Sequence, residues 1–525
     1  MQRNALVMAY NKAGIADFAK GLQLHGFRIW GSKGTVAELA KNGIEATDIA
    51  TIVGDPILGH RVVSLSREIF AGILARDSAE DREELARLNI PEFHLVAVDF
   101  YPLQQELQDP AHTRESIIEK TDIGGPTAVR AAAKAGRIVV CDPTDRAKVL
   151  SWLSAGRPDE QAFLDALAAK AELIVSRYAL ASASGRSNGA YRGLFGKEAA
   201  VCKYGENAYQ SPAALYDEQI EDPLALPRFR VVEGTPPSYN NWCDIDRLLQ
   251  TATHIAAAFD VNEGTVPMIA VGAKHGNACG AAISSDSADA LKKMLAGDPL
   301  SIFGGLVLTN FPIDGALADI LAGKMLDGII APAFTPDAVE RLRRKGDKCR
   351  FIENKGLAFV SKESLDTAER FRYVRGGFLT QPNYTFVMDF AHPELKKYGA
   401  ATKEQERDML LASAVGCTSN SNTIALAKNG MLIGSGVGQQ DRVGAAHLVL
   451  TRATRSMHMV SGASAYSDSF FPFPDAPEAL IKAGVSTILS TSGSVKDGET
   501  VALCQQKNVP LYLIPDSLGR GFFGH

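Results

Sequence analysis

The sequence predicts an α/β fold of several domains, the first of them built around a parallel doubly wound sheet. Short apolar segments alternate with helical patterns through about the first 150 residues, a rhythm typical of parallel doubly wound sheets. The same alternation returns in the last third of the chain. Several apolar segments also end in polar turns that contain glycine, where α/β folds commonly present reactive side chains.

The composition is that of an ordinary globular protein. Of the 525 residues, 46% are hydrophobic and 22% are charged. At about 100–200 residues per domain, this length corresponds to roughly three or four compact units. The formal net charge of −5 is small for this size and argues against a nucleic-acid-binding surface.

The cysteines and the apolar segments indicate a cellular compartment. The seven cysteines are scattered and contain no C-x-x-C pair, which is typical of reduced thiols and not of a disulfide framework or a zinc site. The first residues lack the apolar core of a signal peptide, and no run of about 18 apolar residues appears. We therefore expect a cytoplasmic protein without a membrane span.

The first region alternates strands and helices. We expect strands at 5–9, 27–30, 93–99 and 137–141, and helices at 15–24, from about 36, and at 126–135. Residues 31–35 (GSKGT) and 122–126 (DIGGP) form glycine-containing connections whose N–H groups can hold a phosphate, although most such turns only reverse the chain. Residues 176–212 are rich in Ser, Gly and Ala, and we place a domain boundary there.

Residues 274–282, which read KHGNACGAA, are the stretch around which the chain is organised. They follow an apolar run at 266–271 that we interpret as a buried strand ending at Gly272. Lysine, imidazole, amide and thiol groups then occur close together without a helical or strand period. Two interpretations remain open: an ordinary loop with a solvated Lys274 and His275, or a loop that presents a reactive site.

The last third repeats the earlier organisation. We expect a helix at 403–415, the SNSN segment at 419–422, a strand at 423–427 and a turn at 436–442 (GVGQQDR) that opens another helix. Residues 466–475 (YSDSFFPFPD) combine carboxylates, phenylalanines and prolines, which suits a pocket for a flat ring. The chain ends with the unusual tail GRGFFGH.

Together these segments resemble, in collinear order, the bifunctional family that joins aminoimidazole carboxamide ribotide (AICAR) transformylase to inosine monophosphate (IMP) cyclohydrolase in purine biosynthesis. The most specific pieces are KHGNACG, KYGENAYQ, DPLSIFGG, DGIIAP, the SNSN and GVGQQDR pair, and SDSFFPFPD followed by GSVKD. The resemblance implies a methylglyoxal-synthase-like parallel-sheet domain at 1–190 and a transformylase region of two cytidine-deaminase-like α/β subdomains at 200–365 and 366–525.

The resemblance also implies the partners. The family forms homodimers whose transformylase sites use residues of both chains, with a nucleotide and a folate as substrates. We expect neither nucleic acid nor a membrane as a partner. The H-x-E and C-x-x-C ligands that zinc deaminases require are absent, so we expect no zinc and no other metal.

The implied reaction moves a formyl group from 10-formyltetrahydrofolate to the 5-amino group of AICAR. That amine is a poor nucleophile, so the reaction needs a base near the amine and a cation or hydrogen-bond donors near the oxyanion. His275 matches the proton acceptor of the family. Lys274 matches the neighbouring lysine that stabilises charge, and Asn422 matches the amide that orients the substrate.

The resemblance carries further residues onto this sequence. Those expected to bind the ribotide are Lys203, Tyr204, Asn241, Phe303, Gly304, Asp327, Arg442 and Arg520. Those expected to bind folate are Phe470, Pro472 and Asp475. Three positions depart from the family pattern: Lys203 replaces Arg, Tyr209 replaces His and Ala278 replaces Pro.

The cyclohydrolase half departs further. The residues that the resemblance assigns to it are Lys33, Arg61, Tyr101, Asp122 and Lys134. However, Val63 stands where the family has a lysine, and Ser66 and Arg67 replace His and Pro. Valine cannot stabilise an oxyanion or hold a phosphate, so we expect ring closure to IMP to be weak or lost, with Lys33 offering at most partial compensation.

Three alternatives remain open at the level of sequence. The chain could be fully bifunctional, or it could transfer formyl groups to a related heterocyclic amine, because the departures lie on the acceptor side. A third alternative is a degenerate relative that binds a nucleotide without turnover. The retained Lys274, His275 and Asn422 argue against this last alternative, because a pure binder needs no base beside the amine.

Overall fold

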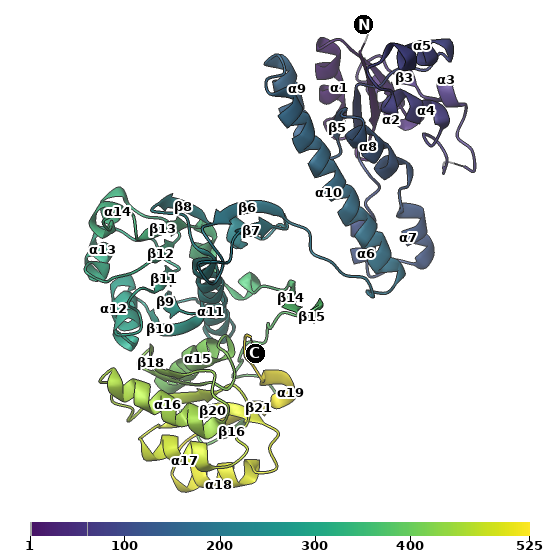
Figure 1. Cartoon of the computed structure of the whole chain (residues 1–525). Helices are drawn as coiled ribbons and strands as arrows, with labels where there is room; N and C mark the ends of the chain where they lie inside the picture. Colours follow the sequence, from purple (N-terminus) through teal and green to yellow (C-terminus); the bar gives the residue numbers. More distant parts are fainter. Residues whose placement is uncertain (1–2, 60, 525) are drawn as a thin grey trace. The chain divides into compact units, whose positions relative to one another are not determined.

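A computed structural model describes residues 3–59 and 61–524. The chain divides into two compact units, with the division between Phe195 and Gly196 (Figure 1). We describe each unit by itself. In both units the predicted α/β class is confirmed.

Unit 1 is built on a five-stranded sheet in which every pair of neighbours is parallel. The strand order is β3-β2-β1-β4-β5. The strands are β1 (Arg3–Met8), β2 (Phe27–Gly31), β3 (Thr47–Asp48), β4 (Leu95–Val98) and β5 (Ile138–Val140). The central strands are apolar on both faces because helices cover both, and Leu6, Val7 and Val96 are fully buried.

The helices of unit 1 follow the strands in the predicted rhythm. They are α1 (Ile15–Leu24), α2 (Lys33–Lys41), α3 (Ala50–Val53), α4 (Arg67–Leu74), α5 (Ala79–Arg87), α6 (Leu103–Gln108), α7 (Arg114–Lys120), α8 (Gly124–Lys134), α9 (Asp145–Ser154) and α10 (Glu160–Arg186). We placed a boundary within 176–212, and the division between the units falls inside that stretch, although residues 176–186 of it are the last part of α10. Small residues do not end a helix whose inner face is already fixed by Leu167, Ala171 and Val175.

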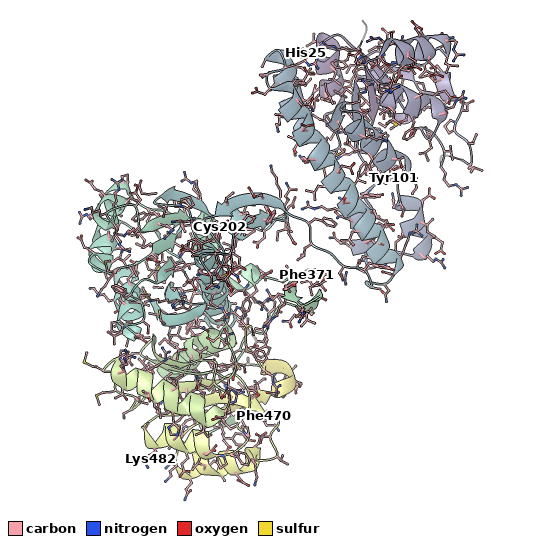
Figure 2. All side chains as sticks on the ribbon, in the orientation of Figure 1. His25, Tyr101, Cys202, Phe371, Phe470 and Lys482 are labelled. Atoms are coloured by element: carbon pink, nitrogen blue, oxygen red, sulfur yellow. The ribbon has the colours of Figure 1, made fainter. Side chains whose placement is uncertain are left out.

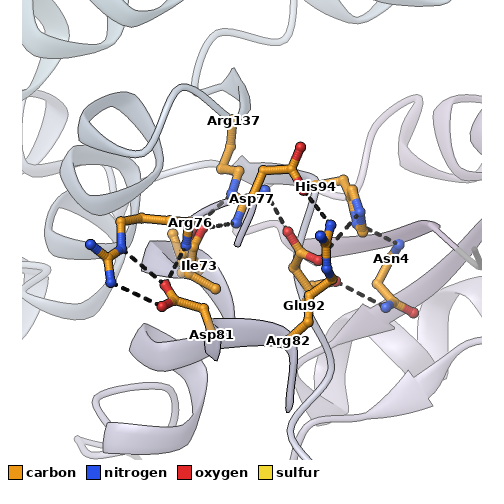
Figure 3. A network of polar contacts seen from close by, with 10 residues as sticks. Asn4, Ile73, Arg76, Asp77, Asp81, Arg82, Glu92, His94 and Arg137 are labelled. Carbon is orange, nitrogen blue, oxygen red and sulfur yellow. Dashed lines mark hydrogen bonds and ion pairs between the residues drawn. The ribbon is translucent and has the colours of Figure 1, made fainter. Parts of the chain in front are cut away.

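A network of polar contacts around Arg137 ties the amino ends of the unit 1 strands together (Figure 3). The Arg137 guanidinium donates to the carbonyl of Ile73 at 2.9 Å and to the carboxylate of Glu92 at 2.9 Å. The side-chain amide of Asn4 donates to the backbone carbonyl of Glu92 at 2.9 Å. These contacts stabilise the sheet at the amino ends of its strands. The cleft of this unit lies at the opposite, carboxyl ends.

Unit 2 contains a twelve-stranded mixed sheet of order β16-β21-β20-β19-β17-β18-β10-β9-β11-β12-β13-β8. Its first-half strands are β8 (Arg230–Glu233), β9 (Met268–Lys274), β10 (Asn277–Ser284), β11 (Leu306–Thr309), β12 (Gly328–Ala331) and β13 (Arg350–Glu353). Its second-half strands are β16 (Lys396–Tyr398), β17 (Ile424–Lys428), β18 (Met431–Gly436), β19 (Ser464–Ser467), β20 (Thr487–Ser492) and β21 (Leu511–Pro515).

The two halves of this sheet share one topology. Each half has an antiparallel edge strand (β8 or β16), three parallel strands (β11–β13 or β19–β21) and a hairpin (β9–β10 or β17–β18). The hairpins meet in the middle of the sheet, where β10 pairs antiparallel with β18. The strands and helices expected in the last third of the chain therefore repeat the topology of the first half of unit 2.

Helices cover both faces of the unit 2 sheet. They are α11 (Tyr239–Glu263), α12 (Ser287–Gly297), α13 (Gly315–Leu321), α14 (Pro336–Leu342), α15 (Lys403–Cys417), α16 (Arg442–Arg455), α17 (Asp475–Lys482), α18 (Asp497–Gln506) and α19 (Asp516–Gly519). The long helices α11 and α15 share one apolar core that spans both halves. On the other face, α12–α14 and α16–α18 form two separate cores.

Two small ribbons accompany the large sheet. One joins β6 (Lys197–Cys202) to β7 (Ala213–Asp217), and the other joins β14 (Glu369–Val374) to β15 (Gly377–Pro382). The β14–β15 ribbon, marked by Phe371 in Figure 2, is mostly exposed. No helix in the described part of the chain combines the length and apolar character needed to cross a membrane.

Candidate functional site

Unit 1 carries a cleft of about 720 Å³ at the carboxyl ends of β1 and β4, where α8 begins. Strands that end at the same edge of a parallel sheet commonly form a ligand site there. Its polar and charged lining residues are Tyr10, Lys12, Ser32, Arg61, Ser64, Asp99, Tyr101, Glu119, Lys120, Thr121, Asp122 and Arg186. Tyr101 is labelled in Figure 2.

The structure brings three of the five predicted cyclohydrolase residues to this cleft. Arg61, Tyr101 and Asp122 line it. Among the described lining residues, Lys33 and Lys134 do not occur. Lys33 is the exposed first residue of α2, and Lys134 is exposed at the far end of α8, whereas the cleft lies at the start of that helix.

Asp122 is held firmly at the start of α8. Its carboxylate accepts a hydrogen bond from the backbone N–H of Gly125 at 2.9 Å, and its own N–H donates to the hydroxyl of Tyr178 at 2.7 Å. Burial raises the pKa of Asp122, partly offset by the N–H groups that it faces. Burial also raises the pKa of Tyr101, and the nearby Asp122 adds to that rise.

Two lysines of the cleft escaped the sequence analysis. The ammonium of Lys12 donates to the carbonyl of Ala9 and lies 3.4 Å from the hydroxyl of Thr35, and burial lowers the Lys12 pKa. The ammonium of Lys120 lies 3.4 Å from the hydroxyl of Tyr10. Their positions gave a signal, because Lys12 closely follows the first strand and Lys120 closely precedes the DIGGP turn. Val63 also lines the cleft.

In unit 2, the stretch read as a strand followed by a loop is a β-hairpin. Strand β9 continues to Lys274, and β10 begins at Asn277. His275 (φ 54°) and Gly276 (φ 69°) form the two-residue turn between them, and Asn429 (φ 54°) and Gly430 (φ 72°) form the matching turn in the second half. Two positive φ angles are what a tight hairpin turn requires. The hairpin therefore fixes Lys274 and His275 at the carboxyl end of β9, in the middle of the sheet.

A first group of predicted residues gathers beside this turn. The ammonium of Lys274 donates to the backbone carbonyl of Phe303 at 2.5 Å. The Phe303 ring is 61% exposed and therefore free to contact a ligand. Gly304 and Asp327 lie just before β11 and β12, and the N–H of Asp327 donates to the carbonyl of Gly305 at 2.9 Å.

Of the residues expected from the β6–β7 connection, Tyr204 lies near Arg350. Arg350 lies near enough to both Asp327 and Tyr204 for their charges to affect its pKa, which burial lowers. Lys203 and Tyr209 are exposed in the same connection. The side-chain oxygen of Asn241 already accepts from the N–H and the hydroxyl of Ser238, both at 3.0 Å. Ser238 is the N-cap of α11 and Asn241 completes its capping box, so the amide N–H groups of Asn241 remain for a substrate.

A cleft of about 550 Å³ opens next to the hairpin turn. Its lining includes Lys274, His275, Cys279 and Asn420. Burial raises the pKa of the Cys279 thiol to about 12, so this thiol is protonated near neutral pH and is not a nucleophile. Within residues 3–59 and 61–524, no group of three or more His, Cys, Asp or Glu could hold a metal ion.

A second group surrounds Asn422, which lies just before β17. The peptide bond between Ser421 and Asn422 is cis. The side-chain amide of Asn422 donates to the carbonyl of Gln439 at 2.9 Å, and the two backbones exchange hydrogen bonds of 3.1 Å. Arg442, at the start of α16, forms a buried ion pair with Asp468, which is 0% exposed. Its guanidinium is therefore already engaged in an ion pair within the chain.

The predicted folate residues lie close to this second group. The guanidinium of Arg520 lies 5.6 Å from the centre of the Phe470 ring and forms an ion pair of 2.7 Å with Asp516. The carbonyl of Pro472 accepts from the hydroxyl of Ser494 at 3.4 Å. Asp475 begins α17 (Figure 2 labels Phe470). These contacts order the loop after β19 beside the start of α16.

The pairing directions of the strands place both groups at the same edge of the unit 2 sheet. Among the described residues that line the 550 Å³ cleft, Asn420 represents the second group, and Asn422, Arg442 and Phe470 do not occur. Lys274 and His275 are thus brought together, while Asn422 faces Gln439.

Comparisons with known proteins agree along the whole chain. Residues 132–452 match the family model described as "AICARFT/IMPCHase bienzyme", and residues 14–127 match the model described as "MGS-like domain". The "Bifunctional purine biosynthesis protein PurH" of Rhodopirellula baltica is 35% identical over 100% of this chain and 99% of its own.

Two further relatives carry the same name. The protein of Oceanobacillus iheyensis is 33% identical and that of Anoxybacillus flavithermus is 34% identical, each over 97% of this chain and 98% of its own. A solved structure described as "Crystal structure of ForH" is 33% identical over 35% of this chain and 100% of that chain, with a TM-score of 0.31.

Proposed function

This chain belongs to the AICARFT/IMPCHase bienzyme family, and on that premise we propose that it transfers a formyl group from 10-formyltetrahydrofolate to the 5-amino group of AICAR, with ring closure to IMP weak or lost. Family members are enzymes of purine biosynthesis, and the formyl donor of the family is 10-formyltetrahydrofolate. The observation that carries the proposal is the hairpin turn that fixes Lys274 and His275 beside a 550 Å³ cleft.

The proposed chemistry follows from the poor nucleophilicity of the 5-amino group of AICAR. Its lone pair is delocalised into the imidazole ring, so it attacks the formyl carbon well only if a base removes its proton as the new bond forms. His275 accepts that proton, and when the tetrahedral intermediate collapses the bond between the formyl carbon and the folate N10 breaks, with the proton passing to N10 so that tetrahydrofolate leaves. Lys274 stabilises the negative charge on the formyl oxygen, and Asn422 holds the carboxamide so that the amine points at the formyl carbon.

Ring closure is proposed to be weak because of one side chain. Val63 lines the unit 1 cleft at the place where the family resemblance implies a lysine. The loss of one such electrostatic contact typically costs about 10²–10³ in rate. Lys12, Lys120 and Arg61 still line the cleft, so an anionic nucleotide has cations to bind there even where the reaction is slow.

The transformylase site is proposed to form between two copies of the chain in the cytoplasm. Lys274 and His275 open on one cleft, whereas Asn422, Arg442 and the 470–475 loop form a neighbouring group outside its lining among the described residues. A second copy that presents its own Asn422 group to Lys274 and His275 would complete the site. A homodimer with closed symmetry gives two such sites.

The test is a product analysis with both substrates. With AICAR and 10-formyltetrahydrofolate, we expect formylated ribotide to accumulate while IMP forms slowly. Rapid IMP formation would refute the weak ring closure but not the formyl transfer. If another aminoimidazole is formylated much faster than AICAR at a fixed donor concentration, the acceptor is the related amine instead. Absence of formyl transfer to any of these acceptors would refute the proposal as a whole.

A further inference from the structure

The C-terminal tail, which carries the unusual GRGFFGH sequence, packs against the rest of unit 2. Gly521 and Phe523 are buried, and Phe523 is 5% exposed. The N–H of Gly521 donates to the carbonyl of Asp468 at 3.1 Å, and the N–H of Phe523 donates to the carbonyl of Ser419 at 2.9 Å. A Cβ atom on Gly521 would lie 2.3 Å from the hydroxyl of Tyr384, so this point of the tail has room only for glycine. The tail therefore runs directly beside the SNSN segment.

A single buried arginine joins this tail to the SNSN segment. Arg247 comes from α11 and is 8% exposed. Its guanidinium donates to the carbonyl of Phe523 at 2.9 Å, to the carbonyl of Thr418, and to the side-chain oxygen of Asn420 at 3.4 Å. Burial lowers the pKa of Arg247 to about 10, which leaves it charged near neutral pH. Three segments far apart in the sequence thus meet at one side chain.

A second arginine completes the arrangement. The guanidinium carbon of Arg247 lies 4.6 Å from the centre of the Phe523 ring, and that of Arg370, from the β14–β15 ribbon, lies 3.5 Å from it. Guanidinium groups over an aromatic face are attracted by the ring, most strongly where water is excluded. The carboxylate of Asp246 lies near both arginines and offsets their mutual repulsion.

The segment held in this way is the one that carries the second group of site residues. Asn420 lines the cleft of Lys274 and His275, and Asn422 follows two positions later. On its other side, the segment is held by the N–H of Gly438, which donates to the carbonyl of Asn420 at 3.1 Å. On the tail side, the contacts of Arg247 and Phe523 add to the hydrogen bond of 2.8 Å between the hydroxyls of Thr251 and Thr418 in restraining the segment.

We propose that Arg247, Phe523 and Arg370 form a clasp that positions the 418–422 segment for formyl transfer. This inference rests on the proposed function, because it assigns the clasp to the same site. The three are positioning residues, since they act through Asn420 and Asn422. The clasp is expected to affect the rate of the chemical step more than the binding of the ribotide, because a misplaced orienting group costs rate even where the substrate still binds.

The test compares variants of the full-length protein. Phe523→Ala and Arg247→Met should each lower kcat about 10- to 100-fold while the dissociation constant for AICAR changes little. Phe523→Tyr keeps the ring and should retain most of the rate, whereas Phe523→Leu keeps only the apolar bulk and should not. Arg372→Met removes an exposed arginine from the same ribbon and is the matched control, with an unchanged kcat expected.

A second measurement separates the clasp from the proposed function. Hydrogen–deuterium exchange of peptides covering 418–422 should become faster in Phe523→Ala, with exchange in unit 1 unchanged. The clasp is wrong if this exchange stays at the wild-type rate, or if kcat survives both Phe523→Ala and Arg247→Met. If the wild-type protein transfers no formyl group, the proposed function fails, and the exchange rates still decide whether Phe523 holds the segment. If Arg247→Met does not fold, Phe523→Ala decides alone.

Discussion

At the scale of single residues, His275 combines a catalytic side chain with a demanding backbone position. Its φ of 54° is unfavourable for most side chains but common for asparagine. The chain itself places Asn429, with the same φ, at the matching turn of the second half. Asparagine at position 275 is therefore a replacement that removes the imidazole and keeps the hairpin.

We predict that His275→Asn lowers formyl transfer about 10²–10⁴-fold, the usual contribution of a general base, without lowering the melting temperature. Steady-state kinetics and thermal unfolding measure the two effects. Asn429→Ala, which strains the matching turn and spares the imidazole, is the control and should cost stability while leaving the rate constant of the chemical step largely intact. Wild-type kcat in His275→Asn would remove His275 from the mechanism.

Position 63 offers the opposite kind of test, a gain of activity. Val63 is half-buried and lines the unit 1 cleft, so a lysine there can place its ammonium among the remaining cleft residues. We predict that Val63→Lys raises the rate of IMP formation from formylated ribotide about 10²–10³-fold. Ile57→Lys adds the same charge to the same loop at a side chain that is 60% exposed, and should change nothing. An unaltered rate in Val63→Lys would show that another departure limits ring closure.

At this scale, the sequence indicated which residues belong to a candidate site better than it indicated the hydrogen bonds and ion pairs that they form. Lys274, Tyr101 and Asp122, which the family resemblance assigned to the two sites, each line a cleft. That Asn241 completes the capping box of α11 and that Arg442 is paired with Asp468 could not be predicted, because both partners are set by folding. Lys12 was missed because a lysine after a strand is common, and only the structure shows it beside Thr35 in a cleft.

At the scale of elements, the buried pair of Arg442 and Asp468 links the start of α16 to the end of β19. Burial raises the pKa of Asp468, and the guanidinium of Arg442 counteracts that rise. When a carboxyl has a raised pKa in the folded state, the unfolded state ionises first as the pH rises. Stability is therefore lost as the pH rises from the ordinary carboxyl pKa through the folded one.

We predict that Arg442→Met destabilises unit 2 by about 3–5 kcal/mol near pH 7, because it leaves a buried carboxylate without its partner. The deficit should shrink at about pH 5, where Asp468 can be protonated in the folded state. Chemical denaturation at the two pH values measures it. The double variant Arg442→Met/Asp468→Asn should recover part of the loss at the higher pH. A deficit that is equal at both pH values would contradict the electrostatic explanation.

Elements with a clear period could be predicted closely, and α1 occupies the expected residues 15–24. The hairpin at KHGN could not be predicted. Its turn consists of His275 and Gly276, a pair whose local sequence indicates a loop. Pairing of β9 and β10 across the sheet decides that conformation. In α10, the Ser/Ala-rich segment resembled a linker although long-range packing of Leu167 and Val175 keeps it helical.

At the scale of the whole molecule, the chain combines a parallel-sheet unit with a unit that repeats one topology twice. The sequence showed the alternation of strands and helices in both regions but not the joining of the two halves, because β10 and β18 pair across about 150 residues of chain. The expected division of unit 2 at 365 and 366 stays a prediction. The seam between the halves brings Lys274, His275 and Asn420 to one cleft, while Asn422 lies outside its described lining.

The most direct test of the shared transformylase site mixes two inactive variants, His275→Asn and Asn422→Ala, under conditions in which subunits exchange. If each site takes His275 from one chain and Asn422 from the other, every mixed dimer has one intact site. Activity should then return toward about a quarter of the wild-type value at random exchange. If exchange is complete and the mixture remains as inactive as its two components, each site lies within one chain and the account is wrong.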